Sequence, residues 1–267
     1  MSPPENIAIE VNDLVSHYGE REILHGIDMT VMQGEIMVIM GGSGSGKSTL
    51  LRHLIGLNQP TSGSIKLLGH DITKIPEQEM FALRRQMGVS FQGGALFNSM
   101  SVGENIALPL REHTELDDNT IQIMARMKLE VVNLDGFEDL MPSELSGGML
   151  KRVALARAIV LDPRLLFFDE PSAGLDPVAS VELDELILNL QEAMGMSIVV
   201  VTHELESAFK IADRITVLDK GHILMIGTVD EVRGSDNPRI VSLLHRQPGR
   251  EEVDADAYLQ RLTRELV

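Results

Sequence analysis

The sequence contains no cysteine and no tryptophan, and only 3% of its 267 residues are aromatic. The absence of cysteine excludes disulfides, thiolate metal sites and cysteine nucleophiles, and it is typical of proteins from reducing compartments. The scarcity of aromatic side chains removes the stacking platforms that readers of single-stranded nucleic acid need. Basic residues are also few, because 23 Lys and Arg stand against 40 Asp and Glu, a formal net charge of −17. Such a surface repels phosphate backbones, so we expect no nucleic acid partner.

Long apolar runs are missing as well. Residues 1–6 have neither the basic start nor the apolar stretch of a signal peptide, so we do not expect export. No window approaches the ~18 uninterrupted apolar residues of a membrane span, and the longest candidate, residues 153–161, already contains Arg157. Any role at a membrane is therefore expected to depend on a partner. With 43% hydrophobic and 24% charged residues, the chain has the composition of an ordinary folded globule.

Hydrophobic periodicity in the first quarter of the chain predicts strands followed by a helix. Short alternating runs at 8–11 and 22–31 are typical of antiparallel strands and predict a β-layer. Residues 35–40 are almost wholly apolar and end at a glycine cluster, which predicts a buried strand. Residues 48–57 continue with a helical pattern, so this part of the chain is expected to run strand, tight loop, helix.

The second half of the chain repeats that order. Two apolar runs, 165–168 and 197–201, are candidate buried strands, and residues 179–194 between them have a helical pattern. Because strand, helix and strand in succession form a right-handed crossover, they predict a parallel sheet. Residues 214–226 return to a strand pattern around a short turn and predict a closing hairpin.

Residues 99–160, between these halves, differ in character. They are rich in Leu, Met, Glu and Arg and poor in β-branched runs, which predicts an inserted α-helical subdomain with Pro109 and Pro142 as helix breakers. At the other end of the chain, residues 247–267 carry apolar side chains at helical spacing among charges. They are expected to form a C-terminal helical tail.

The glycine cluster at residues 41–48, GGSGSGKS, matches the pattern G-x-x-x-x-G-K-[ST] of a phosphate-binding P-loop. It follows a predicted strand and precedes a predicted helix, as such a loop must. A flexible Gly/Ser linker is the alternative, but a linker would not end a buried strand. The residues expected to bind the nucleotide here are Gly41, Gly42, Ser43, Gly44, Ser45, Gly46, Lys47, Ser48 and Thr49.

Each residue type in this loop has a physical task. The glycines let consecutive backbone N–H groups converge on phosphate oxygens, and the helix N-terminus adds a partial positive charge. Lys47 is expected to reach the β- and γ-phosphates, and Ser48 to ligate Mg²⁺. ATP and Mg²⁺ are therefore the expected cofactors.

An acidic pair, Asp169 and Glu170, ends the apolar run 165–168. Two carboxylates at the end of a buried strand need a cation or a reaction. In the Walker B interpretation, Asp169 joins the Mg²⁺ shell and Glu170 orients and deprotonates the attacking water. The alternative is a surface acidic pair that begins a helix before Pro171.

The segment LSGGM at residues 145–149, called the signature segment below, resembles the signature of ATP-binding-cassette (ABC) ATPases. It offers a second Gly-rich helix terminus that could hold a γ-phosphate, although it lies far in sequence from the P-loop. The resemblance implies a head-to-tail homodimer, in which Ser146, Gly147 and Gly148 of one copy close over ATP on the other copy's P-loop. An ordinary turn before a helix is the alternative for Ser-Gly-Gly alone.

Other residues match the motifs of this family in order along the chain. Gln92 matches the Q-loop glutamine, whose amide can contact Mg²⁺ or water, and His203 matches the switch histidine that contacts the γ-phosphate. Asp176 belongs to a D-loop-like segment, residues 172–176, that would cross the dimer interface. Tyr18 is placed like the aromatic residue that stacks on adenine, but it is equally a turn residue before Gly19. The resemblance thus implies the catalytic residues Glu170, His203, Gln92 and Lys47 and the Mg²⁺ ligands Ser48, Gln92 and Asp169.

The resemblance extends over about residues 7–246 and implies the fold. We expect an α/β P-loop NTPase with a RecA-like parallel sheet, an antiparallel β-layer and the helical insert. Residues 1–246 form the expected ATP-binding domain. One position departs from the family, because Met149 stands where most members have Gln. Methionine cannot make the amide hydrogen bonds that Gln makes there.

A narrower resemblance rests on this signature variant, on PLREHT at 109–114 and on QGGALF at 92–97. These segments are similar to the ATPase of the Mla/MCE phospholipid-transport systems of Gram-negative bacteria. The resemblance implies ATP-driven phospholipid transport between inner and outer membranes, with a peripheral position on the cytoplasmic face of the inner membrane. The partners it implies are an integral membrane permease, an MCE-domain lipid-binding protein and a small STAS-domain subunit.

Three alternatives stay open. The chain could power an ABC transporter for another solute. A soluble ABC protein that acts on ribosomes or DNA is a second possibility, although such proteins usually carry two cassettes or coiled coils and this chain has net charge −17. The third is a nucleotide sensor without enzymatic activity, which the presence of Glu170 disfavours.

Overall fold

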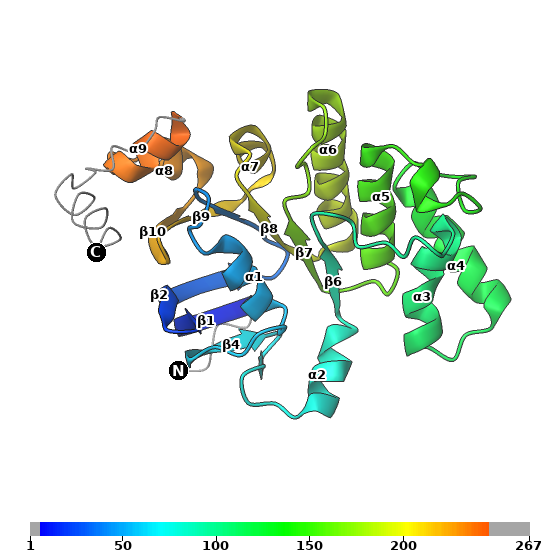
Figure 1. Cartoon of the computed structure of the whole chain (residues 1–267), viewed down its shortest axis with the longest axis horizontal. Coiled ribbons are helices and arrows are strands. Elements are labelled where there is room, and N and C mark those ends of the chain that lie inside the picture. The colour runs from blue at the N-terminus through cyan, green and yellow to red at the C-terminus, as the bar shows by residue number, and fades with distance from the viewer. Residues whose placement is uncertain (1–5, 246–267) are drawn as a thin grey trace, which may run out of the picture.

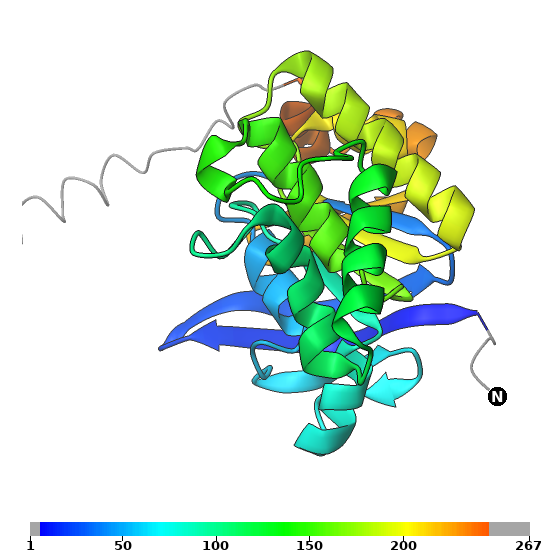
Figure 2. The same cartoon turned by 90° about the vertical axis from the view of Figure 1, so that its right-hand side faces the viewer.

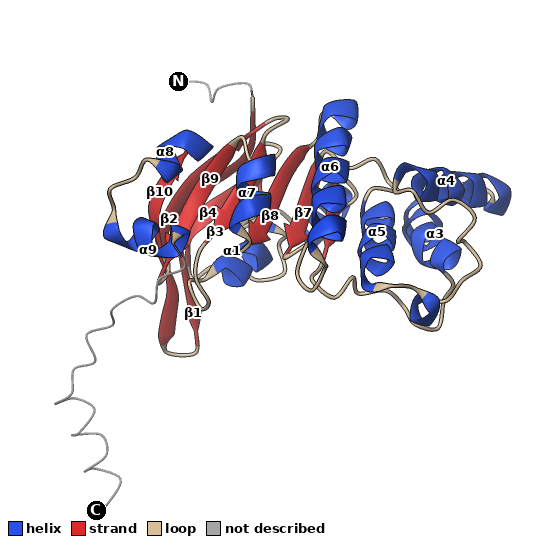
Figure 3. Cartoon of the chain, turned by 90° about the horizontal axis from the view of Figure 1, so that it is seen from above, coloured by secondary structure: helices blue, strands red, loops and turns tan. Residues whose placement is uncertain are grey.

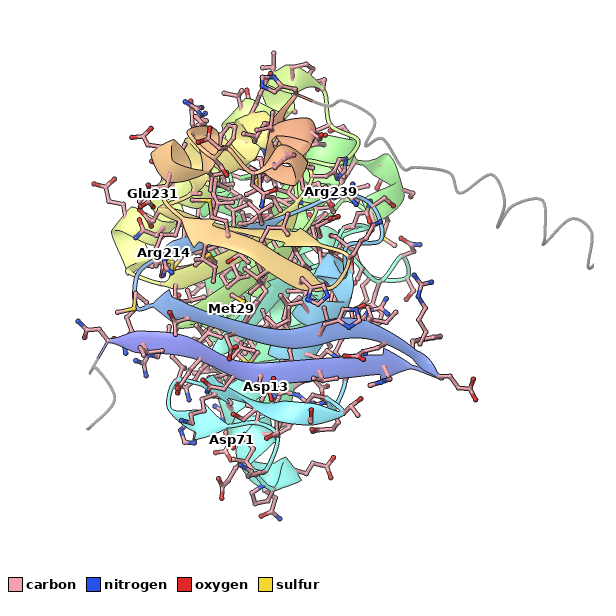
Figure 4. The ribbon with its side chains drawn as sticks, turned by 90° about the vertical axis from the view of Figure 1, so that its left-hand side faces the viewer. Asp13, Met29, Asp71, Arg214, Glu231 and Arg239 are labelled. Carbon is pink, nitrogen blue, oxygen red and sulfur yellow. The ribbon has the colours of Figure 1, made fainter. Side chains whose placement is uncertain are left out.

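Two β-sheets and the helices around them make up the computed structural model, which describes residues 6–245 (Figure 1). The smaller sheet is antiparallel, with strand order β2-β1-β4-β5. In Figure 4, Met29 on β2, Asp13 on β1 and Asp71 on β5 are labelled on this sheet. This sheet confirms the predicted β-layer and extends it. Its strands are β1 (Ile7–Tyr18), β2 (Arg21–Met32), β4 (Ser62–Leu67) and β5 (His70–Asp71).

The larger sheet has the strand order β10-β9-β3-β8-β7-β6. Its first five strands in sequence are parallel, and β10 pairs antiparallel with β9 as the predicted closing hairpin. The predicted α/β class with a parallel sheet is therefore confirmed. The strands are β3 (Ile36–Met40), β6 (Met87–Ser90), β7 (Leu165–Asp169), β8 (Ser197–Thr202), β9 (Arg214–Asp219) and β10 (His222–Gly227).

Strand β3 divides its side chains between two hydrophobic cores, because successive side chains of a strand point to opposite faces. Met37 and Ile39 belong to the core that includes α1 and the antiparallel sheet. Ile36, Val38 and Met40 belong to the core under the remaining major helices. Figure 1 shows the result, with α1 (Lys47–Leu54) and the smaller sheet below the large sheet and α6 (Pro177–Met194) and α7 (Leu205–Ile211) above it.

Residues 99–160 contain only helices and connecting loops, which lie at one end of the large sheet in Figure 1 and face the viewer in Figure 2. Helix α3 packs against α4, and α5 packs against both and against β6. The prediction that Pro109 breaks a helix is wrong, because Pro109 lies inside α3. A proline in a helix interior costs about 3 kcal/mol, and the buried apolar face of α3 outweighs that cost. The elements are α3 (Val102–His113), α4 (Asp118–Val131), a 3-10 turn (Pro142–Glu144) and α5 (Gly147–Ala158).

The other helices lie beside the two sheets (Figure 3). Helix α1 is shorter than the predicted 48–57, because Gly56 after it takes a left-handed φ of 67°. Within residues 6–245, no helix combines the length and the apolar character needed to cross a membrane. The predicted tail 247–267 lies outside the described residues. The helices are α1 (Lys47–Leu54), α2 (Glu77–Arg84), α6 (Pro177–Met194), α7 (Leu205–Ile211), α8 (Val229–Arg233) and α9 (Pro238–Leu244).

Candidate nucleotide-binding site

Four of the predicted motifs follow strands of the parallel sheet and lie along its carboxyl edge. The P-loop follows β3, Asp169 ends β7, His203 follows β8 and Gln92 follows β6. Since these strands are parallel neighbours, their ends meet at one edge, where open α/β sheets bind ligands. The pairings that set this alignment are Met40 with Thr202, Asp169 with Val201, and Ser90 with Phe168.

The P-loop backbone depends on its glycines. Gly44 and Gly46 have φ of 73° and 105°, in the left-handed region that side-chain-bearing residues avoid. A Cβ on Gly41 would lie 2.1 Å from the carbonyl oxygen of Leu218, so no larger residue fits there without a backbone shift. These positions therefore hold the loop tight between β3 and α1.

Lys47 is folded over the mouth of this loop. Its Nζ donates hydrogen bonds to the carbonyl oxygens of Gly41 at 2.9 Å and Gly42 at 3.1 Å, and the residue is only 9% exposed. Burial lowers the pKa of Lys47, and the carboxylates of Glu170 and Asp169 act in the opposite direction. The side chain thus holds a poorly solvated positive charge at the loop where an anion would bind.

The carboxylate of Asp169 is only partly satisfied by hydrogen bonds within the described residues. Its Oδ1 is buried and has no hydrogen-bond partner among residues 6–245. Burial, and after it the charge of Glu170, raises the pKa of Asp169. A buried carboxylate oxygen without a partner is costly, and a hard cation such as Mg²⁺ is the type of ligand that removes the cost. The exposed hydroxyl of Ser48, at the start of α1, supplies a second oxygen of the kind Mg²⁺ prefers.

Glu170 and His203 form a hydrogen-bonded pair. His203 Nδ1 lies 2.8 Å from Glu170 Oε2, and the backbone N–H of His203 donates to the same oxygen at 3.3 Å. Because a carboxylate only accepts, the Nδ1 carries the proton. Glu170 itself has φ of 50°, a left-handed conformation that costs a non-glycine residue about 1–2 kcal/mol. Such strain is typical of functional positions, and here it brings the carboxylate to His203.

The signature segment lies apart from the P-loop of its own chain. Ser146 caps α5, where its Oγ accepts a hydrogen bond from the N–H of Met149 at 3.3 Å, and Gly147 and Gly148 begin the helix. Helix α5 packs against β6, which is three strands from β3 in the sheet, or roughly 14 Å at the usual strand spacing. The structure therefore does not bring Ser146 and the P-loop of one chain together.

Two further predicted residues have clear places. Asp176 is the N-cap of α6, and its Oδ1 accepts from the N–H groups of Val178 and Ala179, each at 3.0 Å. Tyr18 ends β1 at the turn of the β1–β2 hairpin and is 84% exposed. Asp176 thus has a structural task, and its place at a dimer interface stays a prediction. Stacking of Tyr18 on adenine stays a prediction.

Sequence reasoning missed two basic residues of α5 that contact this edge. Lys151 donates to the carbonyl oxygens of Gln92 and Glu170, and Arg157 to those of Gly94 and Ala95. A lysine or arginine in an amphipathic helix normally indicates a solvent-exposed face. Gly88 is a sequence signal for the packing of α5, because glycine inside a strand often marks the close approach of another backbone. A Cβ there would lie 2.3 Å from the carbonyl oxygen of Ala158 and would push α5 away.

A parallel sheet with a P-loop after β3 and an acidic pair after β7 defines a P-loop NTPase. A family model described as "ABC transporter" matches residues 24–173. The intermembrane phospholipid transport ATP-binding protein MlaF of Haemophilus influenzae is 41% identical over 257 residues, 95% of this chain and 97% of that protein. MlaF of Escherichia coli K12 is 42% identical over 236 residues, 88% of each chain. The "probable ribonucleotide transport ATP-binding protein mkl" of Mycobacterium bovis is 40% identical over 91% of this chain and 67% of its own length.

Solved structures agree with this grouping. The ATP-binding cassette MJ0796, solved as a post-hydrolysis dimer with ADP and Pi, is 28% identical with a TM-score of 0.75, over 83% of this chain and 98% of its own. CbiO1 of Clostridium perfringens, part of the CbiONQ transporter complex, gives a TM-score of 0.79 at 27% identity, over 96% and 99%. The chain therefore belongs to the ABC transporter family, as an ATPase of that family.

Proposed function

We propose that this chain is the ATP-hydrolysing subunit of a transporter that moves phospholipid between the inner and outer membranes of a bacterial envelope. Phospholipid as the cargo is supported by the near-complete alignment with MlaF, over 95% of this chain and 97% of the Haemophilus influenzae protein. ATP hydrolysis is supported by the pairing of Glu170 with His203 at the sheet edge that also holds the P-loop.

The proposed chemistry uses the residues of that edge. Lys47 and the backbone N–H groups of the P-loop hold the phosphates and offset their charge. The carboxylate of Glu170 orients the attacking water and accepts its proton, while His203 keeps that carboxylate in place. Gln92 is exposed, and its carbonyl accepts from the same lysine, Lys151, as the carbonyl of Glu170. Its side-chain amide is proposed to hold the water or the metal.

Mg²⁺ fits the donor set at this edge. Asp169 offers the buried Oδ1 that has no hydrogen-bond partner in the described part of the chain, and Ser48 and Gln92 offer a hydroxyl and an amide oxygen. A bound Mg²⁺ would supply positive charge to the phosphate oxygens. The chain's own contribution is to hold these oxygens in place, while the positive charges of Arg52, Lys151 and Lys47 oppose the rise in the pKa of Asp169 that burial causes.

The signature segment is proposed to complete the site of a second copy. Ser146, Gly147 and Gly148 form a Gly-rich helix terminus that is remote from its own P-loop, and the related cassette MJ0796 was solved as a dimer. In a head-to-tail homodimer, this terminus would face the γ-phosphate on the partner's P-loop, with Asp176 near the interface. Tyr18, exposed at its hairpin, would stack on adenine.

The proposed assembly places the dimer on the cytoplasmic face of the inner membrane, held by a permease. Since residues 6–245 contain no helix suited to span a membrane, attachment through a membrane subunit fits the described chain. An MCE-domain lipid-binding protein and a small STAS-domain subunit complete the proposed system. Closure of the dimer on ATP would drive the permease, and hydrolysis would reset it.

One observation favours a second candidate cargo. The mycobacterial relatives named as probable ribonucleotide transport proteins are 40% identical to this chain over 242 residues, almost as similar as the MlaF relatives. The motor would then be the same and the cargo a nucleotide. The site residues alone do not separate the two, because they bind ATP in either case.

Affinity purification of the tagged chain from membranes, followed by mass spectrometry of bound proteins and lipids, separates these candidates. We expect a permease, an MCE-domain protein and phospholipid to copurify. A solute-binding protein in place of the MCE-domain protein, with no enriched phospholipid, would count against the phospholipid proposal. The Lys47→Ala variant provides the control for ATP-dependent changes in the bound lipid.

A further inference from the structure

Lys151 joins two loops of the nucleotide site. It lies on α5, five residues after Ser146, which caps that helix. Its Nζ donates one hydrogen bond to the carbonyl oxygen of Gln92 and another, at 3.3 Å, to the carbonyl oxygen of Glu170. Because β6 and β7 are neighbours, both carbonyls lie just past the carboxyl ends of adjacent strands. One side chain thus bridges the backbone of two residues proposed to act in hydrolysis.

Helix α5 holds the loop after β6 at a second point. Arg157, six residues after Lys151, donates to the carbonyl oxygens of Gly94 at 2.7 Å and Ala95 at 2.9 Å. Both of these loop residues have left-handed φ, 73° and 51°. Together the two basic residues bind three of the four carbonyls of residues 92–95. The loop and the helix are therefore expected to move as one unit.

On the side of β7, Lys151 supports the strained residue Glu170. The N–H of Glu170 donates to the carbonyl oxygen of Val201 at 2.8 Å, and its own carbonyl accepts from Lys151. These two bonds hold the peptide groups on either side of its φ of 50°. The carbonyl of Glu170 also accepts from the N–H of Ala173 at 3.2 Å, so loss of the lysine would leave the backbone of Glu170 with two hydrogen bonds in place of three. The carboxylate that contacts His203 would thereby lose part of its support.

The surroundings of Lys151 act on its positive charge in two opposite directions. The side chain is half-buried, and burial lowers the pKa of Lys151, while the carboxylates of Asp169 and Glu170 oppose that shift. A neutral side chain of similar length would fill the same space without donating to either carbonyl. This makes methionine the informative replacement.

We propose that Lys151 is a positioning residue for ATP hydrolysis, which holds the backbone of Gln92 and Glu170 in fixed relation to α5. The inference rests on the proposed function and deepens it. Because α5 begins with the signature segment, a shift of this helix when a second copy closes on it passes through Lys151 to the chain's own Gln92 and Glu170. The same helix thereby links the two nucleotide sites of a dimer.

Steady-state ATP hydrolysis by the full-length chain tests the proposal with a matched pair of variants. Arg152 is the neighbour of Lys151 on α5, but its guanidinium pairs with Glu182 of α6 at 2.6 Å. We expect Lys151→Met to lower kcat about tenfold to a hundredfold and to leave KM within about twofold, since positioning affects the chemical step. Lys151→Arg, which can also donate to two carbonyls, is expected to restore kcat to within about threefold, and Arg152→Met to leave kcat unchanged.

Hydrogen exchange of the nucleotide-free, full-length chain gives a readout that does not depend on hydrolysis. We expect the amides of Glu170 and Gly94 to exchange about tenfold faster in Lys151→Met than in Arg152→Met. Unchanged exchange at both amides would overturn the proposal. So would a loss of kcat shared equally by the two variants, or a loss that Lys151→Arg does not repair. Absence of turnover in the wild type would instead contradict the proposed function, and exchange would then decide the role of Lys151.

Discussion

The P-loop and the signature segment are two Gly-rich helix N-termini in one chain, and they are built differently. The P-loop is enclosed at both ends: Lys47 is buried over its carbonyls, and a Cβ on Gly41 would meet backbone at 2.1 Å, although Gly42 and Gly44 between them are open. The signature segment is open, because Ser146 and Gly147 are exposed and a Cβ on Gly147 would find nothing within 4 Å. The same local device is thus enclosed at its ends in one place and open in the other, as the proposed dimer requires. Packing around the loop decides which of the two it is.

Glu170→Gln is expected to have the largest effect, because it removes the proposed base and leaves both loops intact. We expect kcat to fall about 10²–10⁴-fold, with ATP still bound. Two ATP-loaded chains should then stay associated, with each P-loop facing the signature segment of the other chain. Light scattering should therefore show a dimer in the presence of ATP and Mg²⁺. Glu206→Gln, at an exposed carboxylate of α7, is the control. A Glu170→Gln chain that hydrolyses ATP at the wild-type rate would contradict the assignment.

Lys47→Ala in the P-loop and Ser146→Ala in the signature segment should differ in their effect on the affinity for ATP. We expect ATP to bind about a hundredfold more weakly to the Lys47→Ala variant, because a buried charge-assisted contact to phosphate is lost. Ser146→Ala should leave the affinity of the monomer unchanged, since this serine lies remote from its own P-loop. Titration calorimetry at a protein concentration that keeps the chain monomeric measures both. Normal affinity in Lys47→Ala would mean that the phosphate site lies elsewhere.

Alanine at Gly41 and at Gly147 compares the packing of the loops directly. We expect Gly41→Ala to lower the free energy of unfolding by about 1–3 kcal/mol, because its methyl group overlaps the carbonyl of Leu218. Gly147→Ala should stay within about 0.5 kcal/mol of the wild type, since its methyl group enters open space. Urea unfolding followed by circular dichroism measures the difference. Equal losses would show that the signature segment is as enclosed as the P-loop.

The smallest expected effect concerns His53, which anchors the helix of the P-loop. The residue is 1% exposed, with Nε2 2.7 Å from Ser16 Oγ and Nδ1 3.0 Å from the carbonyl oxygen of Asn58. Burial lowers the pKa of His53 from 6.5, so folding favours the neutral ring. Its contribution is complete above pH 6.5 and is lost as the pH falls below that value, by at most about 1.4 kcal/mol per pH unit.

A comparison with His53→Gln isolates this effect from other titrating groups. We expect the wild type to lose more stability than the variant between pH 7.5 and 5.5, two values chosen on either side of the usual histidine pKa. Urea unfolding at both pH values measures it. Parallel losses in the two proteins would show that His53 does not titrate in that window. A Ser146→Ala chain should follow the wild type, because no histidine anchors α5 in this way.

Much of the site could be predicted because it depends on local chemistry. The P-loop needs glycine at left-handed positions and a lysine at a helix start, and residues 41–48 display both in sequence. The apolar runs before it and before Asp169 predicted buried strands, and β3 and β7 lie there. The helical pattern at 179–194 likewise predicted a helix between the two strands, and α6 (Pro177–Met194) lies there.

Features that depend on distant segments could not be predicted in this way. Strand β6 has four residues and contains Gly88, so its pattern is too short to identify. Pro109 stays inside α3 because the burial of that helix outweighs the local preference. The contacts of Lys151 join positions 59 and 19 residues apart, and they arise only when α5 packs on β6.

Residue types alone specified a phosphate loop, an acidic pair and the strands that carry them, because backbone conformation and hydrophobic periodicity are local properties. The assembly of those parts along one sheet edge required the parallel pairing of β3, β8, β7 and β6. The difference between the enclosed first glycine of the P-loop and the open signature segment also comes only from the tertiary structure. Enclosure depends on which distant atoms approach, as the carbonyl of Leu218 approaches Gly41, and such an approach exists only in the folded chain.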